Sequence, residues 1–233
     1  MIQPSDLLRY GLWAMMAATA DANRREFHMV TTWLPHFLMN TFALFLPELD
    51  QIVVPDDQRT DTSQDFFGDI RESLDALVRD NPAYAAYVAP IPIGYILSHP
   101  RFNIYKGELA EIRFLGFGLD ALPHGLTALT MTTLYCEATD KAASKMHSQN
   151  ALSKVVKESA QRPALYSGLI LVLATLWWEI GEYLVHRHEL AQRGGDITKI
   201  NMMWGWRDTL NDSAANAIGW ALALGLRRFY RKR

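Results

Sequence analysis

Apolar residues in this chain gather into runs that contain no Asp, Glu, Lys or Arg. A helix that crosses a bilayer needs about 20 mostly apolar residues, and several runs approach that length. They cover residues 27–47, 81–100, 121–136, 163–178 and 213–226. The last three reach spanning length only when the acidic residues at their ends are included in the helices.

The remaining pattern predicts further helices and almost no strand. Residues 10–20 form a shorter apolar stretch, which we interpret as an N-terminal helix rather than a removed leader. Residues 66–78 place apolar side chains on one helical face, which predicts an amphipathic helix on a membrane surface or on a soluble core. Pro90 and Pro92 interrupt their run and favour a re-entrant segment. Only residues 51–54 resemble a strand, so the predicted fold class is all-α.

These elements predict a polytopic membrane helical bundle with about four spans plus amphipathic and re-entrant helices. The stretch 48–65 is acidic and indicates a solvated linker. We therefore expect residues 1–110 to form an N-terminal helical region, and residues 111–233 to form the membrane helical core.

Loop charges suggest an orientation. Residues 141–162 and the C-terminal tail are rich in Lys and Arg, which places both on the cytoplasmic side by the positive-inside rule. The loop 187–207 between the last two apolar runs then lies outside. If Arg24 and Arg25 hold the start of the run 27–47 inside, the count closes with four spans. The expected protein is a multi-pass component of the inner (cytoplasmic) membrane with a cytoplasmic C-terminus.

Composition excludes some classes without deciding between soluble and membrane proteins. The net charge of −2 and the 21% of charged residues give no basic field for nucleic acid. A single cysteine, Cys136, rules out an internal disulfide. The hydrophobic share of 49% lies between those of ordinary soluble and ordinary membrane proteins.

Acidic and imidazole side chains lie at the ends of three apolar segments. An ionisable group in such a segment costs about 2.5–3.5 kcal/mol on insertion scales, and therefore marks a functional site by default. Within each set the spacing is three or four residues, so its members share one helical face. In the topology above, all three sets lie near the extracytoplasmic face. The sets are Asp120 with His124, Glu179 with Glu182 and His186, and Asp208 with Asp212.

Carboxylates gathered at one depth without matching Lys or Arg invite a divalent metal ion, because they cannot all ionise uncompensated. The expected metal ligands are Glu179, Asp208 and Asp212. The expected catalytic residues are His124 as general acid or base, Asp120 as the group that orients it, and Glu182 as a second ligand or proton acceptor.

Each set also has a simpler interpretation. His124 directly follows Pro123, which favours the first turn of a helix, so it fits a plain helix start. Asp208 with Thr209 favours a helix N-cap, and Glu179 with Glu182 fits the exposed stripe of a soluble amphipathic helix. His186 and His188 are better explained as part of an interfacial charge cluster, because residues two apart do not share a helical face.

Three motifs resemble, in the same order, those of the YjdF-like and VanZ-like bacterial membrane proteins. The resemblance covers roughly residues 114–226 and implies a role in the cell envelope, with glycopeptide resistance for VanZ-like members. Ala121 departs from the family, where Arg or Lys usually follows the first Asp. The motifs are Asp120-Ala-Leu-Pro-His124 with Gly125, Trp178-Glu179-x-x-Glu182, and Trp206-Arg-Asp208-Thr209-x-x-Asp212 with Asn216 and Gly219.

Two functions of different class follow. In the first, the protein is a metal-assisted hydrolase or transferase that acts on a lipid-linked envelope substrate at the outer leaflet. In the second, it is a non-catalytic subunit of a larger membrane complex, or a small transport element, and the polar cluster is interhelical glue. The expected partners are the lipid bilayer, a lipid-linked substrate and other membrane subunits, and not nucleic acid.

Overall fold

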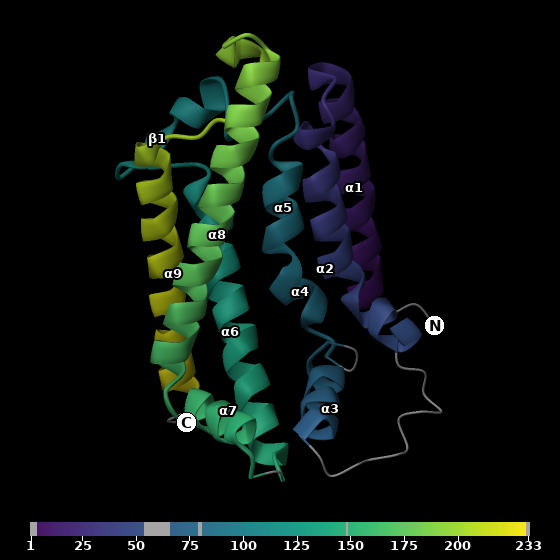
Figure 1. Cartoon of the computed structure of the whole chain (residues 1–233), viewed down its shortest axis with the longest axis vertical. Coiled ribbons are helices and arrows are strands. Elements are labelled where there is room, and N and C mark those ends of the chain that lie inside the picture. Colours follow the sequence, from purple (N-terminus) through teal and green to yellow (C-terminus); the bar gives the residue numbers. More distant parts are fainter. Residues whose placement is uncertain (1–3, 54–65, 79–80, 148, 232–233) are drawn as a thin grey trace.

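The structure is a computed structural model that describes residues 4–53, 66–78, 81–147 and 149–231. Its long helices run along one axis, alternately up and down (Figure 1). The described helices are α1 (Pro4–Phe27), α2 (Leu34–Val53), α3 (Phe66–Val78), α4 (Tyr84–Val88), α5 (Pro90–Ile96), α6 (Ala121–Lys145), α7 (Ala151–Gln161), α8 (Pro163–Gln192) and α9 (Trp206–Arg231). The shorter elements are the 3-10 turns η1 (Val30–Thr32), η3 (Glu108–Glu111) and η4 (Ile197–Lys199), and the strands β1 (Arg113–Phe114) and β2 (Phe117–Gly118). The all-α prediction is confirmed.

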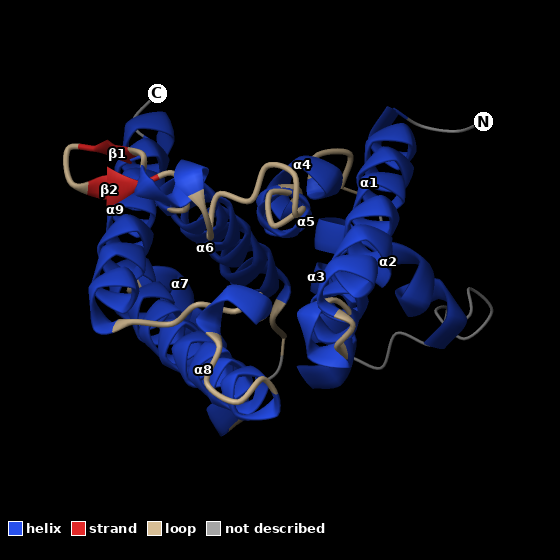
Figure 2. Ribbon diagram, turned by 90° about the horizontal axis from the view of Figure 1, so that it is seen from above, coloured by secondary structure: helices blue, strands red, loops and turns tan. Residues whose placement is uncertain are grey.

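The helices form two groups that meet along α4 and α5. In the view from above, α1 and α2 lie on one side of this pair, and α6, α8 and α9 lie on the other (Figure 2). The first group has an apolar core whose most buried side chains are Met16 and Leu44. The second group carries the candidate site.

In the second group, α6 and α9 approach closely at small residues. A Cβ atom added to Gly219 would lie 2.1 Å from the carbonyl oxygen of Gly125. One added to Gly125 would lie 3.3 Å from the carbonyl oxygen of Ala215. Small residues four apart on one face allow such backbone contact, which is common between helices in membranes. This crossing fixes how the starts of α6 and α9 face each other.

Helix α8 turns polar residues inward and apolar residues outward. Its buried residues are Ser167, Glu179 and Glu189, whereas Leu173 and Trp177 are each 66% exposed. Among the described helices, α8 is the one long and apolar enough to cross a membrane, and only 11% of its most apolar window is buried in the protein. In a soluble monomer this surface would be an unusually large apolar patch.

Hydrogen bonds between side chains join α8 to α9 along much of their contact. They place polar groups in the interface at several levels, as in helix pairs that are held together without a hydrophobic driving force. The pairs are Thr209 Oγ1 to Glu179 Oε2 at 2.5 Å, Asn216 Nδ2 to Thr175 Oγ1 at 3.1 Å, and Trp220 Nε1 to Ser167 Oγ at 2.9 Å.

The proline-containing segment is broken but not re-entrant. Tyr87 on α4 donates a hydrogen bond to Glu137 of α6 at 2.6 Å, while Gly94 on α5 lies beside Pro123 at the start of α6. The α4–α5 pair therefore runs the length of α6 in one direction. The re-entrant prediction is wrong, because the helix resumes directly after the break at Ala89 and Pro90.

The expected placement of Arg24 and Arg25 opposite the 187–207 loop is also wrong. The guanidinium of Arg193, just beyond α8, donates to the carbonyl oxygen of Phe27 at the end of α1. Both helix ends therefore lie at the same end of the bundle (Figure 1). The sequence prediction failed because α1 is a full-length helix, so Arg24 and Arg25 lie at its far end and not at its start.

Helix α3 has the predicted bounds, but its predicted apolar face is only partly buried. Leu77 of that face is buried in the apolar core, whereas Leu74 is 50% exposed and the polar residues Asp69 and Ser73 are buried. The Asp69 carboxylate accepts from the backbone N–H of His147 at 2.9 Å, so a polar contact anchors the helix beside the end of α6.

Two other segments differ from the sequence prediction. Helix α7 lies within the stretch 141–162 that was expected to be a loop, and the side chain of Asn150 caps it by accepting from Ser153 N at 2.8 Å. Residues 51–53 end α2 instead of forming a strand, and Val54 lies outside the described residues. Glu48, expected in the linker, pairs with Arg9 at 2.6 Å within the α1–α2 contact.

Candidate functional site

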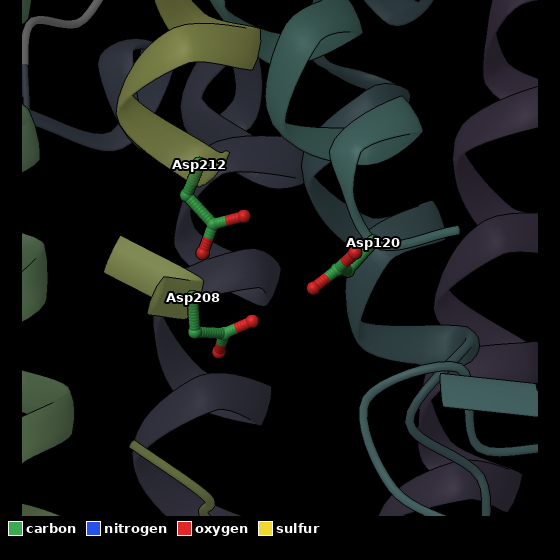
Figure 3. A group of neighbouring side chains, drawn as sticks. All are labelled: Asp120, Asp208 and Asp212. Carbon is green, nitrogen blue, oxygen red and sulfur yellow. The ribbon is translucent and has the colours of Figure 1, made fainter. Parts of the chain in front are cut away.

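Three aspartates meet where α6 and α9 begin. One carboxylate oxygen from each of Asp120, Asp208 and Asp212 lies within 4.8 Å of the other two. Figure 3 shows the Asp120 side chain pointing from α6 toward the other two, which extend from successive turns of α9. The two chain segments are more than eighty residues apart, so the α6–α9 crossing creates this cluster.

The β-hairpin before α6 positions Asp120. Leu115 and Gly116 both have positive φ (52° and 89°) between the paired residues Phe114 and Phe117, as in the two-residue turns that fit the twist of a hairpin. A Cβ atom on Gly118 would lie 2.3 Å from Asp120 Oδ1. Glycine at position 118 therefore leaves room for the carboxylate, which also caps α6 by accepting from Ala121 N at 3.0 Å.

His124 lies one turn into α6 and contacts the cluster. Its Nε2 atom is 3.5 Å from Asp212 Oδ2. Asp212 is only 3% exposed, and its other oxygen, Oδ1, is buried without a hydrogen-bond partner in the described part of the chain. The histidine thus contacts one oxygen of Asp212, while the second oxygen has no partner among the described residues.

Glu179 belongs to the same polar region, but it lies outside the group of three aspartates. Its Oε2 atom accepts from Thr209, and its Oε1 atom is buried with no partner among the described residues. Thr209 directly follows Asp208 in α9. The bond to Glu179 therefore links α8 to the helix that carries two of the aspartates.

Glu182 lies one turn beyond Glu179 on α8. Its Oε1 atom accepts from the indole N–H of Trp178 at 2.8 Å. Glu182 also lines a groove of about 230 Å³ together with residues of α2. The predicted site residues therefore come from three helices, and Glu182 is the member that reaches this groove.

Tyr105 borders the cluster from the loop after α5. Burial raises the pKa of its hydroxyl, and the carboxylates of Glu182, Asp120, Asp212 and Asp208 act in the same direction. The hydroxyl therefore stays protonated and donates to the carbonyl oxygen of Gly94 at 3.1 Å. Sequence reasoning missed Tyr105, because nothing in its local pattern connects it with residues that follow much later.

Another polar network holds the loop that leads into α9. Glu189 is fully buried, and its Oε2 atom accepts from the backbone N–H groups of Asn201 and Met202 at 2.9 and 3.2 Å. His186 Nδ1 lies 2.9 Å from the carbonyl oxygen of Met202. These contacts make Glu189 and His186 supports of the loop, whereas His188 is exposed.

The cap interpretation of Asp208 is wrong. Helix α9 begins at Trp206, so Asp208 lies inside the first turn. The capping aspartate is instead Asp120, which was expected to orient His124. In the structure the His124 ring contacts Asp212 of α9. Asp212 is therefore the residue placed to orient His124.

The charge balance of the cluster suits a cation. Within the described residues, these carboxylates form no ion pair with a lysine or arginine, and His124 is the basic partner. Carboxylate oxygens in such a group are the ligands that Mg²⁺, Mn²⁺ and Ca²⁺ prefer. Buried acceptors without partners at Asp212 and Glu179 add to the case, because an unsatisfied buried polar atom is costly.

Comparisons with protein-family models, curated proteins and solved structures give no match for this chain. The resemblance to YjdF-like and VanZ-like proteins therefore stays a prediction that rests on the quoted motifs.

Proposed function

We propose that the chain is an integral membrane protein whose cluster at the start of α6 and α9 binds a divalent cation and uses it in hydrolysis or group transfer on a lipid-linked envelope substrate. The observation that carries this proposal is the group formed by Asp120, Asp208 and Asp212, together with the unpartnered buried Oδ1 of Asp212. Three like charges this close repel one another strongly unless protons or a cation neutralise them.

The proposed roles follow from the contacts. Asp120, Asp208 and Asp212 hold the cation, which when bound would polarise a water molecule or a substrate oxygen. His124 accepts a proton at Nδ1 while Asp212 holds its Nε2 atom, in the manner of carboxylate-oriented histidines. Glu182, on the groove side, receives or supplies a proton for the substrate.

The outward apolar face of α8 supports the proposal of a membrane environment. Leu169 and Leu173 turn outward where Ser167 turns inward, and lipid would cover this face at no hydrophobic cost. The basic end of the bundle, with α7 and the end of α9, would face the cytoplasm by the positive-inside rule. The cluster then lies in the extracytoplasmic half, and the proposed location is the inner membrane.

The protein is expected to sediment with membranes, to resist extraction by alkaline carbonate, and to need detergent for purification. The physical reason is the outward apolar face of α8, only 11% of whose most apolar window is buried in the protein. Fractionation of expressing cells followed by immunoblotting measures this. Recovery as a monodisperse soluble monomer would contradict the membrane proposal.

Catalysis is tested with His124→Gln, a substitution that keeps polarity and approximate size but removes the base. Purified protein loaded with Mn²⁺ is incubated with a bacterial membrane lipid extract, and the products are measured by mass spectrometry. We expect Mn²⁺-dependent conversion of a lipid by the wild type, and about 100-fold less by His124→Gln, in the range that general-base catalysis contributes. Equal conversion by both proteins, or no conversion by either, would reject the enzymatic role.

A second candidate function is that of a non-catalytic membrane subunit. The hydrogen bonds of Thr209, Asn216 and Trp220 across the α8–α9 interface favour it, because such bonds hold helices together without any chemistry. This candidate predicts that no cation binds and that the protein copurifies with other membrane subunits. Measurement of bound Mn²⁺ in the purified protein therefore separates the two candidates.

A further inference from the structure

A groove lies between α2 and α8, on the side of the cluster marked by Glu182. Its volume is about 230 Å³. Most of its walls are apolar, with Met39 from α2, Leu184 and Val185 from α8, and Met202 from the loop before α9. The groove therefore offers a hydrocarbon surface that leads toward a carboxyl group.

The polar groups of the groove are arranged around Trp178. The indole N–H of Trp178 donates to Glu182, and the His36 ring meets the same indole edge to face, with centroids 5.7 Å apart. The rings of Tyr95 and His36 stack, with centroids 6.0 Å apart. These contacts hold His36 in a half-buried position beside the groove.

We propose that this groove binds one hydrocarbon chain of a membrane amphiphile and presents the head group to Glu182. The inference rests on the proposed function, since it identifies the route by which a lipid-linked substrate reaches the cluster. The head group should carry a hydrogen-bond donor, a hydroxyl or an ammonium, because a carboxyl group without a lysine or arginine partner accepts such a donor.

The polarity of the groove and its position favour this occupant. Trp177 and Ile180 are 66% and 58% exposed on the face of α8 that we assign to lipid, and both also line the groove. The groove is therefore continuous with that face, and a lipid chain enters it without crossing water. An extended peptide would need partners for its backbone polar groups, which these apolar walls do not supply.

Gly181 allows a precise test because it lines the groove. A Cβ atom at this position meets no atom within 4 Å, so Gly181→Leu fills the groove without a clash at its Cβ. The matched control is Gly225→Leu on α9, where an added Cβ also meets nothing within 4 Å and which lies outside the groove.

The experiment uses the full chain in vesicles of phosphatidylethanolamine and phosphatidylglycerol that contain a phospholipid with a diazirine on one acyl chain. After irradiation, the labelled residues are mapped by mass spectrometry. We expect labelling of Met39 and Met202 in the wild type and in Gly225→Leu. In Gly181→Leu the labelling of both should fall about tenfold, the size of effect that overpacking by one side chain produces.

Labelling of Leu173, on the outer face of α8, is the internal reference and should be equal in all three proteins. The proposal is overturned if Met39 and Met202 stay unlabelled in the wild type, or if Gly181→Leu leaves their labelling unchanged. Mn²⁺ binding is measured on the same samples. Retained Mn²⁺ binding with no groove labelling rejects the groove alone, whereas groove labelling without Mn²⁺ binding rejects the cation site alone.

Discussion

Replacement of Asp212 by asparagine is expected to lower the affinity for Mn²⁺ by about 100-fold or more, since even residues that only support metal ligands contribute 10–100-fold. Asp212 contributes to the group of three carboxylates, and its buried Oδ1 has no partner among the described residues. Asparagine preserves the shape of the side chain and removes its charge. A titration of purified protein followed by electron paramagnetic resonance of free Mn²⁺ measures the affinity.

The matched control is Glu111→Gln, which removes the same charge from an exposed position shortly before the hairpin. It should bind Mn²⁺ as the wild type does. Without metal, Asp212→Asn should unfold at a higher temperature than the wild type, because it relieves repulsion with Asp120 and Asp208. Wild-type affinity in Asp212→Asn would show that the aspartates are not the ligands.

Replacement of Gly219 by alanine is expected to destabilise the protein by about 1–3 kcal/mol, the usual cost of overpacking a tight interface. The added Cβ would lie 2.1 Å from the carbonyl oxygen of Gly125. That oxygen belongs to the backbone of α6, so one helix must move for the methyl group to fit. Thermal unfolding in detergent, followed by circular dichroism, measures the loss.

Gly225→Ala is the control on the same helix, where an added Cβ meets no atom within 4 Å. It should be neutral or stabilising by up to about 1 kcal/mol, since alanine favours helix more than glycine does. Equal unfolding temperatures for Gly219→Ala and Gly225→Ala would contradict the close α6–α9 crossing. Because that crossing brings Asp120 to α9, Gly219→Ala should also weaken Mn²⁺ binding.

The apolar runs located most of the helices, because a long apolar stretch with few breakers has few alternatives. Helix α3 has the predicted bounds 66–78, and α8 begins at the predicted Pro163. The buried residues of α3 were predicted only in part, because periodicity does not tell which polar side chains find partners inside the protein. Leu77 is buried as its place on the apolar face suggests, but Leu74 of the same face is exposed and Asp69 is buried.

The residues of the site could be predicted from the sequence, but their contacts with one another could not. Spacing places Asp208 and Asp212 on one face, and the structure keeps them there. Spacing does not tell that His124 faces Asp212 at 3.5 Å, because this depends on how α6 crosses α9. Nothing in the local sequence connects Gly118 with the site, yet the absence of a side chain there leaves the space that the Asp120 carboxylate occupies.

The most direct test of the account is the stoichiometry of tightly bound Mn²⁺ in the detergent-purified wild-type protein. We expect one ion per chain in the wild type. The ion should be lost in the triple variant Asp120→Asn, Asp208→Asn, Asp212→Asn, which lacks the three carboxylates that lie within 4.8 Å of one another. The fold of the triple variant is checked by circular dichroism. Equal Mn²⁺ content in the folded wild type and the folded triple variant would contradict the account.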